Sequence, residues 1–289
     1  MSIINSPGGS AVTLTILSED SPNPKNPELK SGHGLAIHVS VKGISLLYDF
    51  GPGGTLIHNS EKMGIRLEDV DVAILSHGHY DHSGDIKTFL EVNSKAVIYH
   101  GRDAFTPRWS ISNGSPREVG IPAEIRELRD EKPERFALIN DLYDREDFVI
   151  LPAAPGLHSK PSGNSLLLAG NEGERLQDDF VDELTLVIRG EKGLVVITGC
   201  SHRGILNISE QIKAYCSKCS VNALIGGFHL RNKEESEENI RFIAGQLAES
   251  LPDSRIYSGH CTESNASSIL GKTFGKRYGK MYTGRILEF

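Results

Sequence analysis

Three histidines and one aspartate lie within six residues of this chain, in the spacing His-x-His-x-Asp-His. The run is His77-Gly78-His79-Tyr80-Asp81-His82, and it follows an apolar segment at 70–75 that is typical of a buried strand. Imidazole and carboxylate groups together suit zinc, manganese or iron. The chain must therefore adopt a fold in which a strand end and the loop after it form a metal site.

The number of ligands predicts two metal ions. Alternate residues of an extended chain point to the same side, so His77 and His79 can face one ion, while Asp81 and His82 turn towards a second. Four ligands exceed what one tetrahedral ion easily takes from one loop, so each ion is expected to be completed from elsewhere in the chain. An accidental surface histidine cluster is the alternative, and the order of ligand types after an apolar strand argues against it.

Five blocks of the sequence resemble the metallo-β-lactamase superfamily. They are the metal run within 76–85, a strand that ends in Asp-x-Gly at 46–51, and the segments 198–205, 226–230 and 259–262. The last three are similar to a branch that includes dihydropterin-ribofuranosylaminobenzene phosphate synthases. The resemblance covers nearly the whole chain. It implies one α/β domain over 1–289, a four-layer αββα sandwich with two mixed sheets facing each other and helices outside.

The resemblance also extends the ligand set. Six residues are expected to bind the two ions: His77, His79 and His202 the first, and Asp81, His82 and His260 the second. Superfamily hydrolases commonly place a bridging aspartate where this chain has Cys200. We therefore expect Cys200 either to bind metal as a thiolate or to be a buried thiol.

Three further residues are expected to support the site. Asp49 follows a strand at a glycine-rich bend, where a carboxylate can hold a ligand histidine by its second ring nitrogen; a plain turn aspartate is the alternative. An equivalent of His33 lies near the metal pocket in the resembling branch, and a simple loop histidine is the alternative there. His229 ends a strand at 221–225 and is a candidate for transition-state stabilisation or proton transfer, while Asp81 would orient the attacking hydroxide.

The segment 101–147 is the least regular part of the chain. We interpret it as an insertion that covers the pocket and sets substrate choice. Arg102, Arg108 and Arg117 lie in this segment and are candidates for binding an anionic group of the substrate. Solvated surface arginines are the more common outcome.

Charge and cysteine content restrict the partners. The net charge of −7 argues against general nucleic-acid binding, which requires a basic face. No apolar run approaches the about 18 residues of a membrane span, and residues 1–10 lack the apolar core of a signal peptide. The four cysteines, including the lone Cys216-x-x-Cys219 pair, are therefore expected to be reduced thiols of a cytoplasmic protein.

These features predict a dinuclear metal hydrolase. It would act on a small-molecule ester, thioester, lactam or phosphoester through a metal-bound hydroxide, with zinc as the expected metal and manganese or iron as alternatives. A second hypothesis is a synthase that joins a dihydropterin to a phosphorylated ribofuranosylaminobenzene and needs a basic patch for the phosphate. A third is a non-catalytic metal-binding or sensor protein, which the missing bridging aspartate makes plausible. The sequence carries no signal for a particular oligomeric state.

Overall fold

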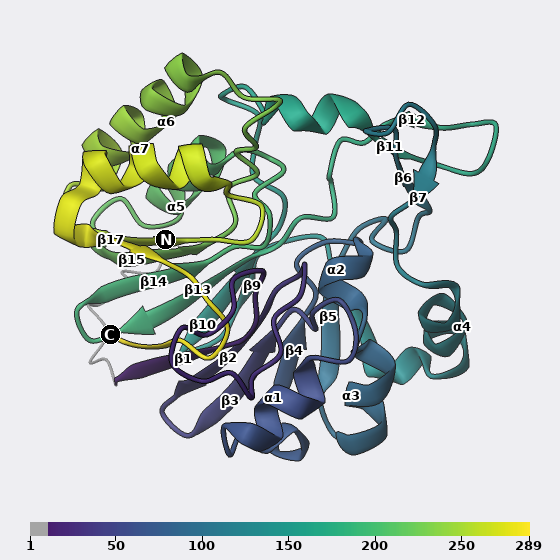
Figure 1. The fold of residues 1–289 in the computed structure, drawn as a ribbon. Helices are drawn as coiled ribbons and strands as arrows, with labels where there is room; N and C mark the ends of the chain where they lie inside the picture. The colour runs from purple at the N-terminus through teal and green to yellow at the C-terminus, as the bar shows by residue number, and fades with distance from the viewer. Residues whose placement is uncertain (1–10) are drawn as a thin grey trace.

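Two seven-stranded sheets packed face to face dominate the computed structural model, which describes residues 11–289 (Figure 1). The first sheet comes mainly from the N-terminal half and is mixed, with antiparallel pairs at β18-β1-β2-β3 and parallel pairs at β3-β4-β5-β8. Its strands, in spatial order, are β18 (Ile286–Glu288), β1 (Val12–Ser18), β2 (Ala36–Val41), β3 (Ile44–Tyr48), β4 (Val72–Ile74), β5 (Val97–Gly101) and β8 (Phe136–Ile139).

The second sheet comes mainly from the C-terminal half. Its strands β14 to β17 are parallel, and the others pair antiparallel, including the β13–β14 hairpin. In spatial order the strands are β17 (Tyr278–Lys280), β16 (Arg255–Ser258), β15 (Val221–Gly226), β14 (Gly193–Ile197), β13 (Thr185–Gly190), β10 (Phe148–Leu151) and β9 (Tyr143–Asp144).

Both faces of the central strands are apolar because both faces are covered. Along β13, Leu186 and Ile188 point into the core between the sheets, whereas Val187 packs under the outer helices. The same alternation in β1 directs Leu14 and Ile16 inwards and Leu17 outwards. This period of two explains why these strands are continuous apolar runs in the sequence.

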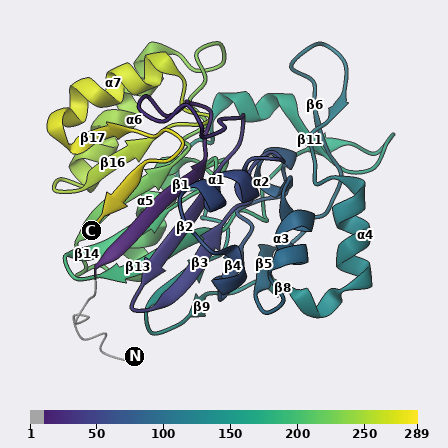
Figure 2. The same cartoon turned by 60° about the horizontal axis from the view of Figure 1, so that its bottom comes forward.

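Helices form the two outer layers and confirm the predicted αββα sandwich. Figure 2 shows α1 and α3 over the first sheet, and α4 completes that layer through Ile125. The opposite layer packs its apolar side chains against the second sheet. The helices are α1 (Leu56–Lys62), α3 (Ile86–Val92) and α4 (Ala123–Glu131) on one side, and α5 (Ile205–Tyr215), α6 (Glu237–Ser250) and α7 (Ser264–Phe274) on the other.

A small third sheet lies beside the sandwich, at the upper right of Figure 1. Its strands are β12 (Leu176–Gln177), β11 (Leu167–Ala169), β6 (Arg108–Ser110) and β7 (Arg117–Glu118). The segment 101–147, predicted to be an insertion, is therefore divided. It contributes β6 and β7 to the small sheet, α4 to an outer layer, and β8 and β9 to edges of the two main sheets.

The cysteine prediction is wrong for one pair. Cys216 and Cys219 form a disulfide directly after α5, whereas Cys200 and Cys261 are free and buried. Within residues 11–289, none of the helices combines the length and apolarity that a membrane span requires. Residues 1–10, for which the sequence predicts no signal peptide, lie outside the described part of the chain.

Candidate metal centre

The six predicted ligands meet at one end of the sandwich, where strands of both sheets finish. They form two groups, and within each group the ligand atoms lie within 4.8 Å of one another. We call His77, His79 and His202 the first group, and Asp81, His82 and His260 the second group. All six residues are buried, with at most 7% of the surface of each residue exposed.

The metal run bends sharply between its two pairs of ligands. His79 is extended, with φ −99° and ψ 152°, and precedes the short helix α2 (Tyr80–Ser83). Asp81 and His82 therefore lie on one helical turn rather than in the loop that the sequence suggested. Gly78 sits at a close approach, where a Cβ atom would lie only 1.8 Å from the carbonyl oxygen of Ala104.

The second sheet supplies its ligands from strained strand ends. Ser201, His229 and His260 follow β14, β15 and β16, and all three have positive φ angles of 58°, 47° and 49°. Left-handed backbone is costly for residues with a Cβ atom, and it is concentrated at functional sites. The turns direct His202, His229 and His260 towards the metal run.

Neutral groups hold the histidines of the first group. The hydroxyl of Ser76 lies 2.9 Å from Nδ1 of His77, and Oδ1 of Asn164 lies 3.0 Å from Nδ1 of His202. Phe180 stacks on the His202 ring with a centroid distance of 3.9 Å. These contacts fix the ring orientations and leave the opposite nitrogen atoms for a ligand.

The first group fits a metal cation. Burial lowers the pKa of His77 and His202 well below the usual range and that of His79 to about 3, so all three imidazoles are neutral at pH 7. The Nε2 atoms of His79 and His202 are buried and have no hydrogen-bond partner among residues 11–289. Nε2 of His77 faces Nδ1 of His79 at 3.0 Å, so these two nitrogen atoms converge. Converging neutral imidazoles are the donors that zinc prefers.

Carboxylates hold the histidines of the second group. Asp49 Oδ2 lies 2.6 Å from Nδ1 of His82, which is the contact predicted for Asp49. Asp20 Oδ1 lies 2.6 Å from Nδ1 of His260. With both Nδ1 atoms bonded to carboxylates, the Nε2 atoms of the two rings face each other 3.1 Å apart. Together with Asp81, they offer two nitrogen donors and one oxygen donor to an ion.

The second group is more strongly ionised than the first. Burial alone would lower the pKa of His260, but hydrogen bonds to Asp20 and Asp81 raise it well above the usual range. Burial alone would raise the pKa of Asp81, but the charges on His82 and His260 hold it below its ordinary range. A proton on His260 therefore competes with a metal ion in this group.

Cys200 lies beside both groups. Its Sγ atom is 3.2 Å from Nε2 of His82, and it falls within the ligand range of His77 on one side and of His260 and Cys261 on the other. Burial raises the pKa of its thiol well above the usual value. The side chain thus occupies the space between the two groups, in line with the predicted alternatives of a thiolate ligand or a buried thiol.

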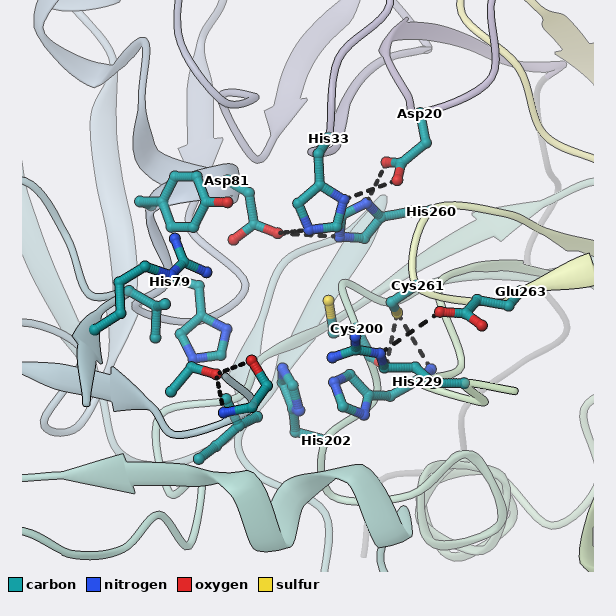
Figure 3. A pocket seen from close by; sticks show the side chains of 17 residues that line it. Asp20, His33, His79, Asp81, Cys200, His202, His229, His260, Cys261 and Glu263 are labelled. Carbon is teal, nitrogen blue, oxygen red and sulfur yellow. Dashed lines mark hydrogen bonds and ion pairs between the residues drawn. The ribbon is translucent and has the colours of Figure 1, made fainter. Parts of the chain in front are cut away.

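One cavity of about 330 Å³ opens onto both groups (Figure 3). His229 lines it, next to His202 at a ring-centroid distance of 4.3 Å, and burial lowers the pKa of His229 to about 3. His33 is the exposed member of the site. It bonds Asp20 at 2.8 Å and lies 3.5 Å from Asp81, so its predicted position near the pocket agrees with the structure.

The predicted anion-binding arginines separate into three environments. Arg108 is buried in ion pairs with Asp178 at 2.7 Å and Asp182 at 2.9 Å, so its donors are occupied and the prediction is wrong for it. Arg102 is mostly exposed and borders a different cavity, so it does not reach this site either. Arg117 lines the cavity above the metal groups.

Sequence reasoning missed several supporting residues. Asp20 holds His260 and His33, and Asn164 holds His202. Glu183 accepts hydrogen bonds from the backbone N–H groups of His202 at 2.5 Å and Arg203 at 2.9 Å, and burial raises its pKa to about 8. Two of them could have been found from their position in the sequence, because Asp20 and Glu183 adjoin strands whose ends meet at the site.

Comparisons with known proteins agree with this geometry. The family model described as the metallo-beta-lactamase superfamily matches residues 33–174, which include the metal run. The chain has the αββα fold of this class, and it belongs to the metallo-β-lactamase superfamily.

Three relatives are similar over nearly their whole length. A 7,8-dihydropterin-6-methyl-4-(β-D-ribofuranosyl)-aminobenzene-5'-phosphate synthase of Methanocaldococcus jannaschii is 26% identical, over 96% of this chain and 97% of its own. An uncharacterized protein of the same organism is 27% identical, over 88% and 93%. The crystal structure of Tm1679, a metal-dependent hydrolase of the β-lactamase superfamily, has a TM-score of 0.79 at 29% identity, covering 96% of this chain and 99% of that one.

Proposed function

We propose that this protein is a dinuclear metal-dependent hydrolase of a small-molecule ester, thioester, lactam or phosphoester, with zinc as the metal. The observation that carries the proposal is the pair of adjoining three-ligand groups opening onto one cavity. The similarity to a metal-dependent hydrolase of the superfamily supports the same reaction class. When bound, a pair of divalent ions supplies Lewis acidity and lowers the pKa of water towards neutrality.

Asp81 has two roles in this proposal. Its carboxylate belongs to the second group, with Oδ2 3.3 Å from Nε2 of His260, and it also lines the cavity. An ionised carboxylate at that wall can accept a hydrogen bond from the attacking water and hold it towards the substrate. Asp20 and His33 keep this arrangement in place. Asp20 bonds His260, which contacts Asp81, and His33 contacts Asp81 directly.

His229 would act as a neutral hydrogen-bond donor. Its low pKa means that the ring carries one N–H and no charge at pH 7. Its Nδ1 atom is buried and without a partner among residues 11–289, and the ring lies against His202 of the first group. A donor in this position can stabilise the negative charge that develops on the substrate oxygen.

The dimensions of the cavity favour a small substrate. A volume of about 330 Å³ is at the lower end of the range for small-molecule sites. The net charge of −7 also disfavours a nucleic-acid substrate. We therefore propose a small molecule as the natural substrate.

A second candidate function is the synthase reaction. The supporting observations are the full-length similarity to the archaeal synthase and the cysteine at position 200, where superfamily hydrolases commonly carry aspartate. The cysteine at position 200 also supports a third candidate, a non-catalytic metal-binding sensor.

Generic substrates separate these candidates. We expect the purified protein to hydrolyse 4-nitrophenyl acetate or bis-p-nitrophenyl phosphate. Chelation should abolish that activity, and restoring the metal to the wild-type protein should recover it. His202→Ala should also lose the activity. His58→Ala is the matched control, because His58 bonds the carbonyl of Glu28 away from the cavity. Metal-loaded protein that hydrolyses neither compound would contradict the hydrolase proposal and favour the synthase or the sensor.

A further inference from the structure

Arg117 lines the cavity and forms no ion pair with any of residues 11–289. No carboxylate among residues 11–289 lies within 4.0 Å of its guanidinium, which sits 5.9 Å from the centre of the Tyr80 ring. The adjacent Glu118 points away and pairs with Arg126 at 3.0 Å. An unpaired guanidinium facing a binding cavity is suited to an anionic ligand.

The backbone holds Arg117 in register with the metal run. The N–H of Tyr80 donates to the carbonyl of Val119 at 3.0 Å, and Gly120 forms a β-bridge with His79. Arg117 and Val119, two residues apart in an extended segment, both line the cavity. The backbone beside Arg117 is therefore anchored to the metal run, and the exposed side chain of Arg117 extends from this anchored segment to the cavity.

Two serine hydroxyls complete this corner. Ser110 lies opposite Arg117 in the β6–β7 pair, and its Oγ is 3.0 Å from Oγ of Ser112. Both serines line the cavity, and Ser110 is 7% exposed. A guanidinium and two hydroxyls offer several donors, which is the pattern that carboxylates and phosphates require.

The other arginine of the cavity differs from Arg117. Arg231 lies 3.6 Å from Glu234 and 3.6 Å from Glu263, so its charge is already compensated. Net positive charge is therefore concentrated at the Arg117 corner.

We propose that Arg117, with Ser110 and Ser112, binds an anionic substituent of the substrate, either a phosphate or a carboxylate, at a distance from the bond that reacts. The claim that this substituent belongs to a hydrolysed substrate rests on the proposed function. The claim that the Arg117 corner binds the anion does not. The small sheet then determines which substrates the metal groups can process.

Calorimetric titration of the metal-loaded protein with phenyl phosphate and with benzoate tests the binding. Arg117→Gln removes a charge-assisted contact, so it should weaken the Kd by about 10-fold or more. Arg117→Lys should retain part of the affinity, and Ser112→Ala should weaken it by a smaller factor. Arg102→Gln, which removes an exposed cation beside a different cavity, is the matched control and should leave the Kd unchanged.

The tighter of the two anions identifies the substituent. Equal affinity of wild type and Arg117→Gln, as expected for an anion held by the metals alone, would overturn the proposal. An equal loss in Arg102→Gln, or the absence of binding to wild type, would overturn it as well.

A second measurement separates this inference from the hydrolase proposal. The ratio of kcat/KM for mono-4-nitrophenyl glutarate to that for neutral 4-nitrophenyl acetate should fall about 10-fold in Arg117→Gln, mainly through KM. If wild type hydrolyses neither ester, the hydrolase proposal fails, and the calorimetric result still decides the anion site. If wild type hydrolyses both and the ratio is unchanged, the anion site fails alone.

Discussion

The two ligand groups differ in the side chains that contact the Nδ1 atoms of their histidines. In the first group, a hydroxyl and an amide, from Ser76 and Asn164, hold His77 and His202. In the second group, the carboxylates of Asp49 and Asp20 hold His82 and His260. A neutral partner orients an imidazole, whereas a carboxylate also makes it more basic.

This difference predicts how each group behaves without metal. The first group is a set of neutral rings, in which Nε2 of His77 faces Nδ1 of His79 and Nε2 of His202 has no partner among residues 11–289. A cation would bind these nitrogen atoms. The second group can satisfy itself with a proton on His260, which Asp20 and Asp81 stabilise. We infer that metal binding in the second group depends more strongly on pH than in the first.

The largest expected effect comes from deleting a ligand of the first group. His202→Ala removes a buried nitrogen donor and the stacking partner of Phe180. We expect the affinity of the first group for its ion to fall by more than the about 10–100-fold that loss of an outer partner costs. Elemental analysis and hydrolysis rates check this. Unchanged occupancy would show that His202 is not a ligand.

The next effect concerns the carboxylates of the second group. Asp20→Asn keeps the shape of the side chain but removes the charge behind His260, so the affinity of the second group for its ion should fall about 10–100-fold. Competition with a fluorescent chelator measures the two affinities separately. An equal loss in both groups would break the distinction between them.

The pH dependence of the metal-free protein should reflect the neutral histidines. The folded pKa of His79, about 3, lies below its ordinary value of 6.5, so its stabilising contribution is present above pH 6.5 and is lost as the pH falls. Between pH 6.5 and pH 5 this loss is about 2 kcal/mol for the one histidine. Urea unfolding at the two pH values should show a smaller change in His79→Asn than in wild type.

His260 changes the free energy of unfolding with pH in the opposite direction to His79. Its raised folded pKa gives a stabilisation that is present below pH 6.5 and is lost as the pH rises through the folded pKa. A His260→Asn variant should therefore lose more stability between pH 6.5 and pH 5 than wild type does. A smaller loss in this variant would contradict the charge assignment.

The smallest expected effect is in the neutral support of the first group. Asn164→Ala removes the contacts to Nδ1 and to the carbonyl of His202. A neutral hydrogen bond contributes about 1 kcal/mol, so the affinity for the ion of the first group should fall about fivefold. Ser165→Ala, next to it and exposed, is a control of the same segment. A loss as large as that of Asp20→Asn would remove the contrast between neutral and charged support.

The parts of the fold and site that the sequence predicted are local or strongly patterned. The buried strands are apolar runs, because helices and the opposite sheet cover both their faces. The ligands at 77–82 lie within one short run, so their proximity required no knowledge of the fold. By contrast, the strands β6 and β7 have three and two residues and no apolar pattern, and their pairing depends on tertiary contacts.

The residues that the sequence did not predict depend on distant partners. Asp20 meets His260 across 240 residues, and nothing near Asp20 in the sequence marks it. Arg108 was expected to bind an anion, but Asp178, 70 residues further along, and Asp182 enclose it in a buried ion pair. The sequence also did not predict helix α2 at the end of the metal run, because four residues are too few to show a helical period.

The most direct test of a dinuclear centre is the metal content of wild type, His202→Ala and His260→Ala, each purified without added metal and measured by elemental analysis. We predict about two zinc, manganese or iron ions per chain in wild type and about one in each variant, with hydrolysis lost in both. A wild-type content near one that persists in His202→Ala would contradict the assignment of two ligand groups.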